Sequence, residues 1–484
     1  MKPLSPCVLL IALSLLGAPS LTQASEEVNR DEAIFGEAAA TDETLEEALE
    51  SSLEARNRQT TVGGQLYSRV SYSLNKEDSA LNSPINSPSL ADIYLDSRPN
   101  DHLRGYMRGR FHYSFSFQNT NSASPWGPAS QSDFSLDQLW FKFNIAERVY
   151  VTFGKQPLRW GSGRFWNPTD FVNSQTRDPL AFVDERTGLG LLKLHLPLED
   201  LGWNFYAIIN GDGAQSPNEA GFALRGEFLF QTTEISISAA DRKGGPEQLG
   251  LDISTGVGPF DLHLETAAHR RTPTLFFKGS SEAPIGYPVF GYDPIPELTS
   301  RDEWLYQAVA GVELGINYSD EDTLYIGAEF FYNQMGYQNP ELFTWLAATG
   351  SFRPLYLGEQ YASLYLALPN PGQLKHSSVT LSGLANLSFD SYITRLDYRV
   401  RALTFLDFFM GVTGYFGKSS DLRFAANVDG RPLSESEESL VKSGLQNRTV
   451  LNDDDINSII AIMNQGLSIP QRLIDFQVGL RMDF

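Results

Sequence analysis

Apolar and polar residues alternate with a period of two from about Val62 to the C-terminus. In the clearest stretch, 102–118, one face carries Arg, His, Tyr and Ser, and the other carries Leu, Met, Phe, Tyr and Gly. A period of two places successive side chains on opposite faces of a β-strand. Such strands fit either a barrel with a lipid-facing outside and a wet lumen or a soluble sandwich.

The number and spacing of these segments favour the barrel. We predict about eighteen strands, each close to the length that a tilted strand needs to cross a bilayer. Alternation is weakest in 88–97 and 359–369, so sixteen strands are the alternative. The predicted strands are 64–74, 88–97, 102–118, 134–145, 148–158, 187–198, 202–210, 220–230, 232–241, 247–257, 259–269, 304–318, 322–333, 359–369, 376–389, 391–401, 405–417 and 472–484.

Tight and long connections alternate along these strands. Ala146-Glu147 and Gly258 form tight turns. Outer-membrane barrels alternate short periplasmic turns with longer extracellular loops. We therefore predict an all-β fold over 61–484, a transmembrane antiparallel β-barrel of about 16–18 strands with both termini in the periplasm. The long loops are 159–186, 270–303, 334–358 and 418–471.

The N-terminus predicts export. A basic start, an apolar run and a small-residue cleavage site ending at Ala24 indicate a signal peptide over 1–24. Segment 25–60 is acidic, with eleven Asp or Glu and three Arg. A leucine at every fourth position predicts one helix over about 42–56. We interpret 25–60 as a periplasmic spacer with one short helix; a plug in the barrel and a self-association helix are the alternatives.

Composition and charge exclude other classes of protein. The chain has 484 residues, of which only 20% are charged and 12% are aromatic, and its formal net charge is −22. Such an acidic chain is unsuited to nucleic acid, because phosphate binding needs a basic surface. The single Cys, Cys7, lies in the predicted signal peptide, which excludes a disulfide framework.

Motifs for catalysis and for metal or cofactor binding are missing. The sequence has no nucleophile elbow, zinc-protease motif, P-loop or dinucleotide fingerprint. We therefore expect no enzyme activity, no cofactor and no metal. Four histidines fall on predicted inward faces, where we interpret them as polar lumen residues rather than catalytic bases: His102, His112, His195 and His263.

The acidic run 453–455 in the last long loop has two interpretations. Its three Asp could bind calcium, which prefers oxygen ligands, but the spacing of a calcium loop is missing. We prefer the acidic first turn of a helix, which Asn452 caps and Gly466 ends. Its apolar face is Ile456, Ile459, Ile460 and Met463.

Two segments of the predicted barrel carry resemblances. Segment 154–156 reads Gly-Lys-Gln, 159–161 reads Arg-Trp-Gly and 167–170 reads Asn-Pro-Thr-Asp. This run resembles porin-like Gram-negative outer-membrane barrels with a Gly-Lys/Arg-Gln strand end, a Trp-Gly step and an Asn-Pro-x-Asp loop, many of them uncharacterised. The last strand ends on the aromatic Phe484, and resembles the strand by which such barrels are recognised for assembly. These resemblances imply a large barrel, the barrel-assembly machinery as a partner and Phe484 as an assembly signal, and they name no solute.

Charges on the predicted inward faces separate into two sectors. The basic sector comes from the first, third, fourth and sixteenth strands, and the acidic sector from the ninth to thirteenth. Two interpretations stay open: solvated charges paired with neighbours, and a transverse field that orients and filters solutes. The basic residues are Arg69, Arg104, Arg108, Arg110, Lys142, Arg395, Arg399 and Arg401; the acidic residues are Glu234, Asp252, Asp261, Glu265, Glu313 and Glu329; five acids, Asp92, Asp96, Asp397, Asp407 and Asp475, are exceptions within the basic sector.

The loop 159–186 is the candidate constriction. Its glycines permit a tight inward turn, and its Trp and Arg side chains can stack on one another. We predict that it folds into the lumen and narrows it; an ordinary surface loop is the alternative. The residues that carry this prediction are Arg159, Trp160, Arg164, Trp166, Asn167, Asp170, Arg177 and Arg186.

Together these features predict an outer-membrane channel of a Gram-negative bacterium. Sixteen to eighteen strands enclose a lumen too wide for side chains to fill, so it would hold water. Its expected partners are outer-membrane lipid and small hydrophilic solutes that diffuse through it. The alternative is a plugged barrel that serves as a surface or assembly component. The sequence leaves the solute and the oligomeric state open.

Overall fold

We describe the fold from a computed structural model of the chain. The described residues are 60–76, 85–115, 132–272, 274, 276–278, 297–299, 302–319, 322–348, 351–372, 374–428, 430–448 and 453–484, apart from 174, 176 and 183. The predicted signal peptide and the helix predicted over 42–56 lie outside these residues.

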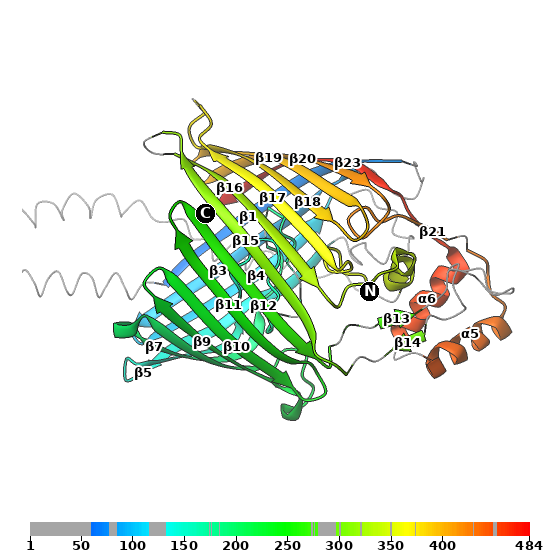
Figure 1. Cartoon of the computed structure of the whole chain (residues 1–484), viewed down its shortest axis with the longest axis horizontal. Helices are drawn as coiled ribbons and strands as arrows, with labels where there is room; N and C mark the ends of the chain where they lie inside the picture. The colour runs from blue at the N-terminus through cyan, green and yellow to red at the C-terminus, as the bar shows by residue number, and fades with distance from the viewer. Residues whose placement is uncertain are drawn as a thin grey trace, which may run out of the picture. The chain divides into compact units, whose positions relative to one another are not determined.

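Eighteen antiparallel strands form a closed barrel (Figure 1). A nineteenth strand in the same sheet, β2 (Ile85–Asn86), is two residues long and pairs only with β1. The eighteen are β1 (Thr60–Asn75), β3 (Pro88–Asn100), β4 (Leu103–Ser114), β5 (Ser132–Ile145), β6 (Val149–Gln156), β7 (Leu189–Leu198), β8 (Trp203–Asn210), β9 (Gly221–Phe230), β10 (Thr233–Arg242), β11 (Glu247–Val257), β12 (Phe260–Arg270), β15 (Leu305–Asn317), β16 (Thr323–Asn333), β17 (Gln360–Pro369), β18 (Ser377–Asn386), β19 (Ser391–Leu403), β20 (Leu406–Gly417) and β23 (Arg472–Asp483).

The barrel closes where the last strand pairs with the first. β23 and β1 are in register from Gln65 opposite Asp483 to Leu74 opposite Ile474. Each predicted strand corresponds to one of the eighteen, including the two with the weakest alternation, β3 and β17. The count of eighteen is therefore confirmed, and the alternative of sixteen strands is wrong.

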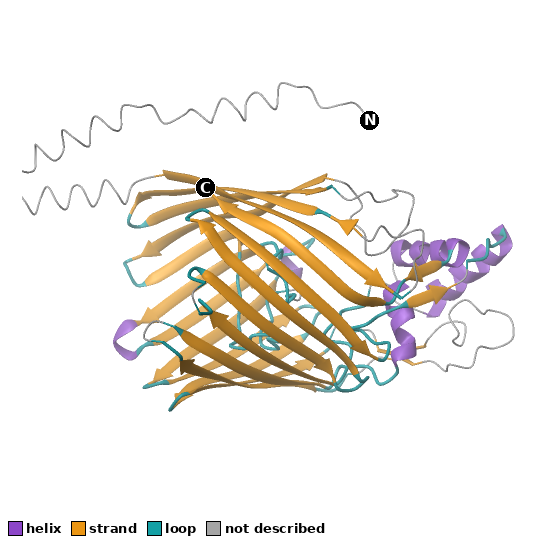
Figure 2. Ribbon diagram, turned by 90° about the horizontal axis from the view of Figure 1, so that it is seen from above, coloured by secondary structure: helices purple, strands orange, loops and turns teal. Residues whose placement is uncertain are grey.

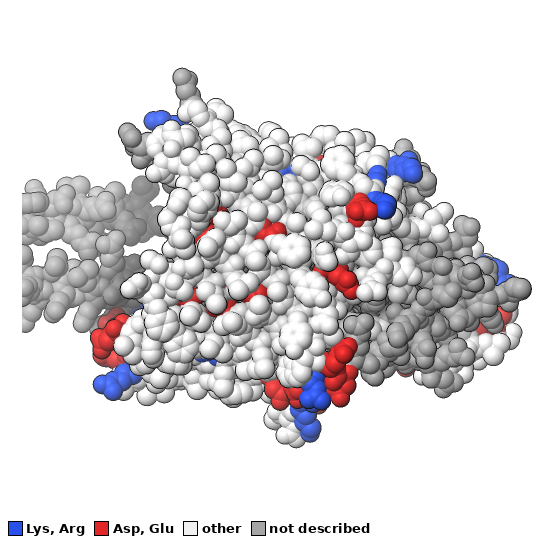
Figure 3. Space-filling view, viewed as in Figure 1, with Lys and Arg blue, Asp and Glu red and all other residues white. Residues whose placement is uncertain are grey.

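The strands have one apolar outer face. On β4, Leu103, Met107 and Phe111 are exposed, whereas Arg110 on the opposite face is buried. The face in Figure 3 is mostly uncharged along the strands, and its largest charged groups lie near their ends. Exposed apolar rows of this kind are stable in lipid, in which a closed barrel leaves no backbone group unpaired. The barrel therefore spans a membrane, with the apolar faces outward and the polar faces inward.

Short and long connections lie at opposite ends of the barrel (Figures 1 and 2). At the short-turn end, Ala146 and Glu147 both have positive φ, 51° and 57°, as a two-residue hairpin turn requires. This confirms the predicted tight turn. Short turns face the periplasm in outer-membrane barrels. No helix among the described residues is long and apolar enough to cross a membrane.

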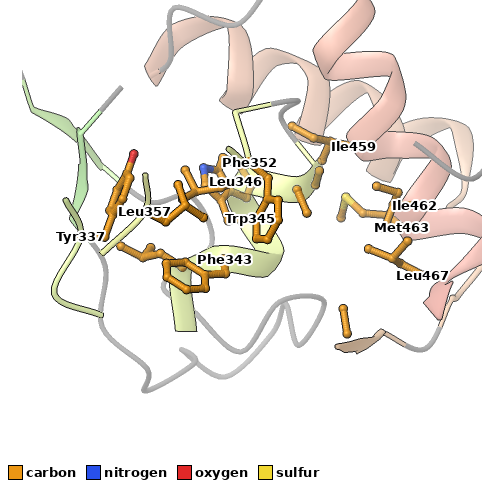
Figure 4. Close-up of a cluster of buried hydrophobic side chains, with 14 of the residues drawn as sticks. Tyr337, Phe343, Trp345, Leu346, Phe352, Leu357, Ile459, Ile462, Met463 and Leu467 are labelled. Carbon is orange, nitrogen blue, oxygen red and sulfur yellow. The ribbon is translucent and has the colours of Figure 1, made fainter. Parts of the chain in front are cut away.

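The long-loop end carries a helical lobe. It contains α4 (Phe343–Ala348), α5 (Glu435–Arg448) and α6 (Asp453–Gln465). Its buried core includes Trp345, Phe352 and Ile459, as Figure 4 shows. Two short antiparallel ladders also lie in long loops. One pairs β13 (Phe276–Lys278) with β14 (Glu297–Thr299), and the other pairs β21 (Ala426–Val428) with β22 (Leu467–Ile469) in the loop that carries α5 and α6.

Helix α6 confirms the prediction for the acidic run. The run 453–455 forms its first turn, and Gly466 follows its end with φ at 83°. The four residues of the predicted apolar face are buried: Ile456, Ile459, Ile460 and Met463. The predicted cap, Asn452, lies outside the described residues.

Candidate functional site

The connection between β6 and β7, residues 157–188, lies within the ring of strands (Figure 2). Its side chains and backbone contact inward-facing groups of β12 and β16 on one side and of β4 and β20 on the other. We call this segment the inner loop. It contains every residue predicted for the constriction, and its described residues form no helix or strand.

Glu265 of β12 anchors one part of the inner loop. Its side chain is fully buried. Gly163 N donates to Oε1 at 2.6 Å, and Thr169 Oγ1 donates to Oε2 at 2.9 Å. Gly163 would place a side chain against Trp166 O if it had one, 2.0 Å from the Cβ position. The glycine therefore permits the close approach of this backbone to Trp166 O.

Glu329 of β16 anchors the adjacent part. Arg164 N donates to its Oε1 at 2.5 Å, and Phe165 N donates to its Oε2 at 2.8 Å. His263 Nε2 of β12 lies 3.0 Å from Glu329 Oε1. Charge-assisted bonds to buried carboxylates are the stronger class of hydrogen bond. Two predicted acidic-sector residues thus hold the inner-loop backbone.

Trp166 connects the inner loop to the long-loop end. Its ring is fully buried and stacks on Phe331 with ring centroids 5.5 Å apart. Its Nε1 donates to Leu355 O at 3.1 Å. Leu355 N in turn donates to Asp421 Oδ2 at 2.9 Å. Burial raises the pKa of the Asp421 carboxyl, although Tyr361 also donates a hydrogen bond to it.

The opposite wall holds the end of the inner loop. Arg110 of β4 pairs with Asp92 at 2.9 Å, and its Nη1 donates to Glu185 O at 3.0 Å. Phe182 packs on Phe409 of β20, with ring centroids 4.3 Å apart. The inner loop is therefore fixed to both walls and spans the interior between them.

Arginines cluster along the inner loop. Arg159 donates to Gly163 O and Asn167 Oδ1, both uncharged acceptors. Arg186 pairs with Asp184 at 2.8 Å and Asp170 at 3.6 Å. Burial, followed by the positive charge of Arg159, holds the pKa of the Arg177 guanidinium below its usual value. Within the described residues, neither Arg159 nor Arg177 has a carboxylate at ion-pair distance.

The remaining residues predicted for the constriction pack or form hydrogen bonds that hold the inner loop in its conformation. Trp160 is buried beneath the guanidinium of Arg225, which lies 5.5 Å from the ring centroid. Asn167 donates to Gly163 O and Trp166 O and so fixes the turn. Burial raises the pKa of Asp170, whose Oδ1 accepts a hydrogen bond from Trp160 N.

The predicted basic sector is largely paired with its own acids. Arg104 binds Asp96 through two hydrogen bonds of 2.8 and 2.7 Å. Arg395 pairs with Asp397. Arg399 and Arg401 share Asp407. All the predicted inward charges lie opposite the exposed apolar faces, but whether they line a conducting path stays a prediction. The ion pairs of this wall are Arg104–Asp96, Arg108–Asp137, Arg110–Asp92, Arg395–Asp397, Arg399–Asp407 and Arg401–Asp407.

Several inward charges escaped the sequence analysis, and Asp137 and Arg225 are two of them. Asp137 of β5 is buried and lies 3.3 Å from Arg110, because a bulge opposite Arg108 and Gly109 shifts the alternation. The three-residue spacing of outward Leu136 and Leu139 was the signal for this bulge. Arg225 of β9 lies among the acids and pairs with Asp252 at 3.3 Å.

Solved structures with a similar fold identify the class of barrel. OccK9 (OpdG) of Pseudomonas aeruginosa is 8% identical with a TM-score of 0.50, and the match covers 88% of this chain and 99% of that one. A BenF-like porin from Pseudomonas fluorescens Pf-5 is also 8% identical at 0.50, with 88% and 98% covered.

The fold is that of an outer-membrane porin. No family model and no curated protein matches the sequence. The apolar exterior and the porin fold place the chain in the outer membrane of a Gram-negative bacterium. The motifs that carried the resemblance in 154–170 belong to the end of β6 and to the inner loop.

Proposed function

We propose that the chain is a porin-like channel through which small hydrophilic solutes diffuse passively, with the inner loop as its constriction. An eighteen-stranded barrel is too wide for wall side chains to fill, so its interior holds water wherever no loop enters. The observation that carries the proposal is the attachment of the inner loop to Glu265 and Glu329 on one wall and to Arg110 on the other.

The constriction is proposed to favour anions. Arg159 and Arg177 lack a carboxylate partner among the described residues, and Arg164 is only loosely paired, 3.7 Å from Glu313. Unpaired cations at a narrow, low-dielectric passage raise the local concentration of anions.

The predicted recognition of Phe484 by the assembly machinery is part of this proposal. Phe484 pairs with Gly64 through two backbone hydrogen bonds, at the end of the seam between β23 and β1.

The test is the conductance of the purified protein in planar bilayers. We expect ion-conducting channels, and deletion of 161–176 should raise their single-channel conductance because it removes the anchored part of the inner loop. A matched control deletes α5 (Glu435–Arg448), which lies at the long-loop end. Both variants should keep the heat-modifiable gel migration of a folded barrel.

Two outcomes would contradict the proposal. A folded wild-type protein without conductance would favour the plugged surface or assembly barrel. Equal conductance before and after deletion of 161–176 would mean that the inner loop is not the constriction.

A further inference from the structure

A short segment at the long-loop end packs on both the inner loop and the helical lobe. Leu355 is buried in one apolar cluster with Trp166 of the inner loop. Phe352 and Leu357, which flank Leu355 in the sequence, are instead buried in the core of the lobe (Figure 4). This segment therefore connects the inner loop to the lobe through side-chain packing on both sides.

Leu355 has a backbone conformation that a residue with a side chain rarely adopts. Its φ is 71°, in the left-handed region that favours glycine. Such a conformation costs energy and persists only where the surroundings fix it. Two hydrogen bonds do so here, because Leu355 N donates to Asp421 Oδ2 at 2.9 Å and Leu355 O accepts from Trp166 Nε1 at 3.1 Å. Leu355 thus connects the Asp421 carboxylate to the Trp166 ring.

The Asp421 carboxylate accepts hydrogen bonds from four donors. Leu355 N and the Tyr361 hydroxyl donate to Oδ2 at 2.9 and 2.7 Å. Asn386 Nδ2 and the Ser420 hydroxyl donate to Oδ1 at 2.7 and 3.3 Å. An ionised carboxylate has only acceptors, so both of its oxygens are satisfied. A proton or an amide group on this side chain would place a fifth donor among the four and leave a buried donor without an acceptor.

No positive charge neutralises Asp421 within the described part of the chain. The residue is buried, and burial raises the pKa of its carboxyl. Tyr361 of β17 is the one titratable side chain that is hydrogen-bonded to it among the described residues. Arg423 of the same loop donates to backbone oxygens instead, and Arg353 of the facing segment is exposed. The carboxyl should therefore gain its proton at a higher pH than an ordinary aspartate.

We propose that Asp421 is a positioning residue for the constriction, which holds the inner loop in place through Leu355 and Trp166. The ionised carboxylate fixes the strained backbone of Leu355, and the Leu355 carbonyl fixes the Trp166 ring. Loss of the negative charge would let Leu355 leave the left-handed conformation and withdraw its carbonyl from Trp166. The inner loop would then populate a second, released arrangement. This role rests on the proposed function, in which the inner loop is the constriction.

The first test observes Trp166 directly, by NMR of the folded protein in detergent with isotope-labelled tryptophan. Each tryptophan gives one indole N–H signal, and Trp166→Phe identifies the signal of Trp166 by its loss. Asp421→Asn keeps the size of the side chain and replaces one carboxylate oxygen by a donor. We expect it to move the Trp166 signal and to leave the signals of Trp140 and Trp203, on strands β5 and β8, in place.

The same signal provides a pH profile. In the wild type it should titrate with a midpoint above about 3.9, the ordinary pKa of an aspartate, because burial raises the pKa of the Asp421 carboxyl. Asp421→Asn should abolish this titration. The wild-type profile needs no substitution, so it tests the proposal even if Asp421→Asn does not assemble. A Trp166 signal that does not titrate above about 3.9 would overturn the role of Asp421.

The second test measures the conductance of single channels in planar bilayers. Asp421→Asn should increase the population of a higher-conductance level roughly tenfold, the shift that corresponds to one lost buried hydrogen bond. The matched control is Asp390→Asn, because Asp390 is an exposed acid that pairs with Lys418 at 2.7 Å. It should change neither the Trp166 signal nor the conductance.

The two tests separate this proposal from the proposed function. An unchanged Trp166 signal in a folded, heat-modifiable Asp421→Asn barrel would overturn the positioning role, whatever the channel conducts. A moved Trp166 signal with unchanged conductance would support the hold of Asp421 on the inner loop, and it would refute the inner loop as the constriction.

Discussion

The two walls of the barrel carry similar charges and use them differently. On β12 and β16, the buried carboxylates of Glu265 and Glu329 accept hydrogen bonds from the backbone of the inner loop. On β19 and β20, the carboxylates of Asp397 and Asp407 instead neutralise arginines of the same wall. The carboxylates of one wall therefore hold a separate segment, whereas those of the other wall neutralise arginines of their own wall. The difference shows that inward charge alone does not define a field across a lumen.

The largest effect is expected when both anchors are removed. Glu265→Ala with Glu329→Ala leaves the buried N–H groups of Gly163, Arg164 and Phe165 without acceptors, at a cost of about 1–3 kcal/mol each. The inner loop should detach from this wall. Single-channel conductance should then rise toward that of the deletion of 161–176, and trypsin should cleave the loop at its arginines.

The control for the anchors uses the same wall. Glu234→Ala with Asp261→Ala removes two inward carboxylates, from β10 and β12, that form no hydrogen bond or ion pair with the described residues of the inner loop. Conductance should therefore stay near wild type. If the anchor variant conducts like wild type while remaining a folded barrel, the hydrogen bonds do not hold the loop.

A smaller effect is expected from reversing the self-paired wall. Arg395→Glu, Arg399→Glu and Arg401→Glu would place three new carboxylates beside Asp397 and Asp407. Like charges so close repel one another and attract cations. We expect the reversal potential to move toward cation preference, with a lower melting temperature.

The matched control replaces the same three arginines by Gln, which removes the positive charge without adding negative charge. Its shift in reversal potential should be smaller. Unchanged selectivity in a folded triple-Glu variant would show that this wall lies outside the conducting path.

The strands could be predicted from the sequence because lipid and water impose a period of two on each of them. Even β3 and β17, with weak alternation, were found. Helix α6 could also be predicted from a local pattern, because one face of the helix is apolar and must be buried. Local periodicity thus accounts for every strand of the barrel.

The contacts of the site could not be predicted in this way. Gly163 and Glu265 are 102 residues apart, and no local pattern indicates that one binds the other. Asp137 was missed because one extra residue in a bulge reverses the alternation of β5. The sequence therefore identified which strands carry acids, but it could not show that the inner loop binds them.

The smallest effect on conductance and stability is expected from a substitution of Glu313. This residue carries a charge on the same wall as Glu265 and Glu329, but it is partly exposed, so it tests charge without burial. Glu313 lies 3.7 Å from Arg164, and both side chains are partly exposed, 31% and 49%. Exposed ion pairs of this kind contribute about 0–1 kcal/mol. Glu313→Gln should therefore leave the melting temperature and the single-channel conductance within error of wild type. The reversal potential should shift at most slightly toward anion preference, because one negative charge beside the inner loop is lost. Glu265 differs in that its carboxylate is fully buried and accepts backbone hydrogen bonds. Glu313→Gln could instead release the inner loop as fully as Glu265→Ala with Glu329→Ala does. That result would mean that attraction between exposed charges holds the loop, and that buried hydrogen bonds do not.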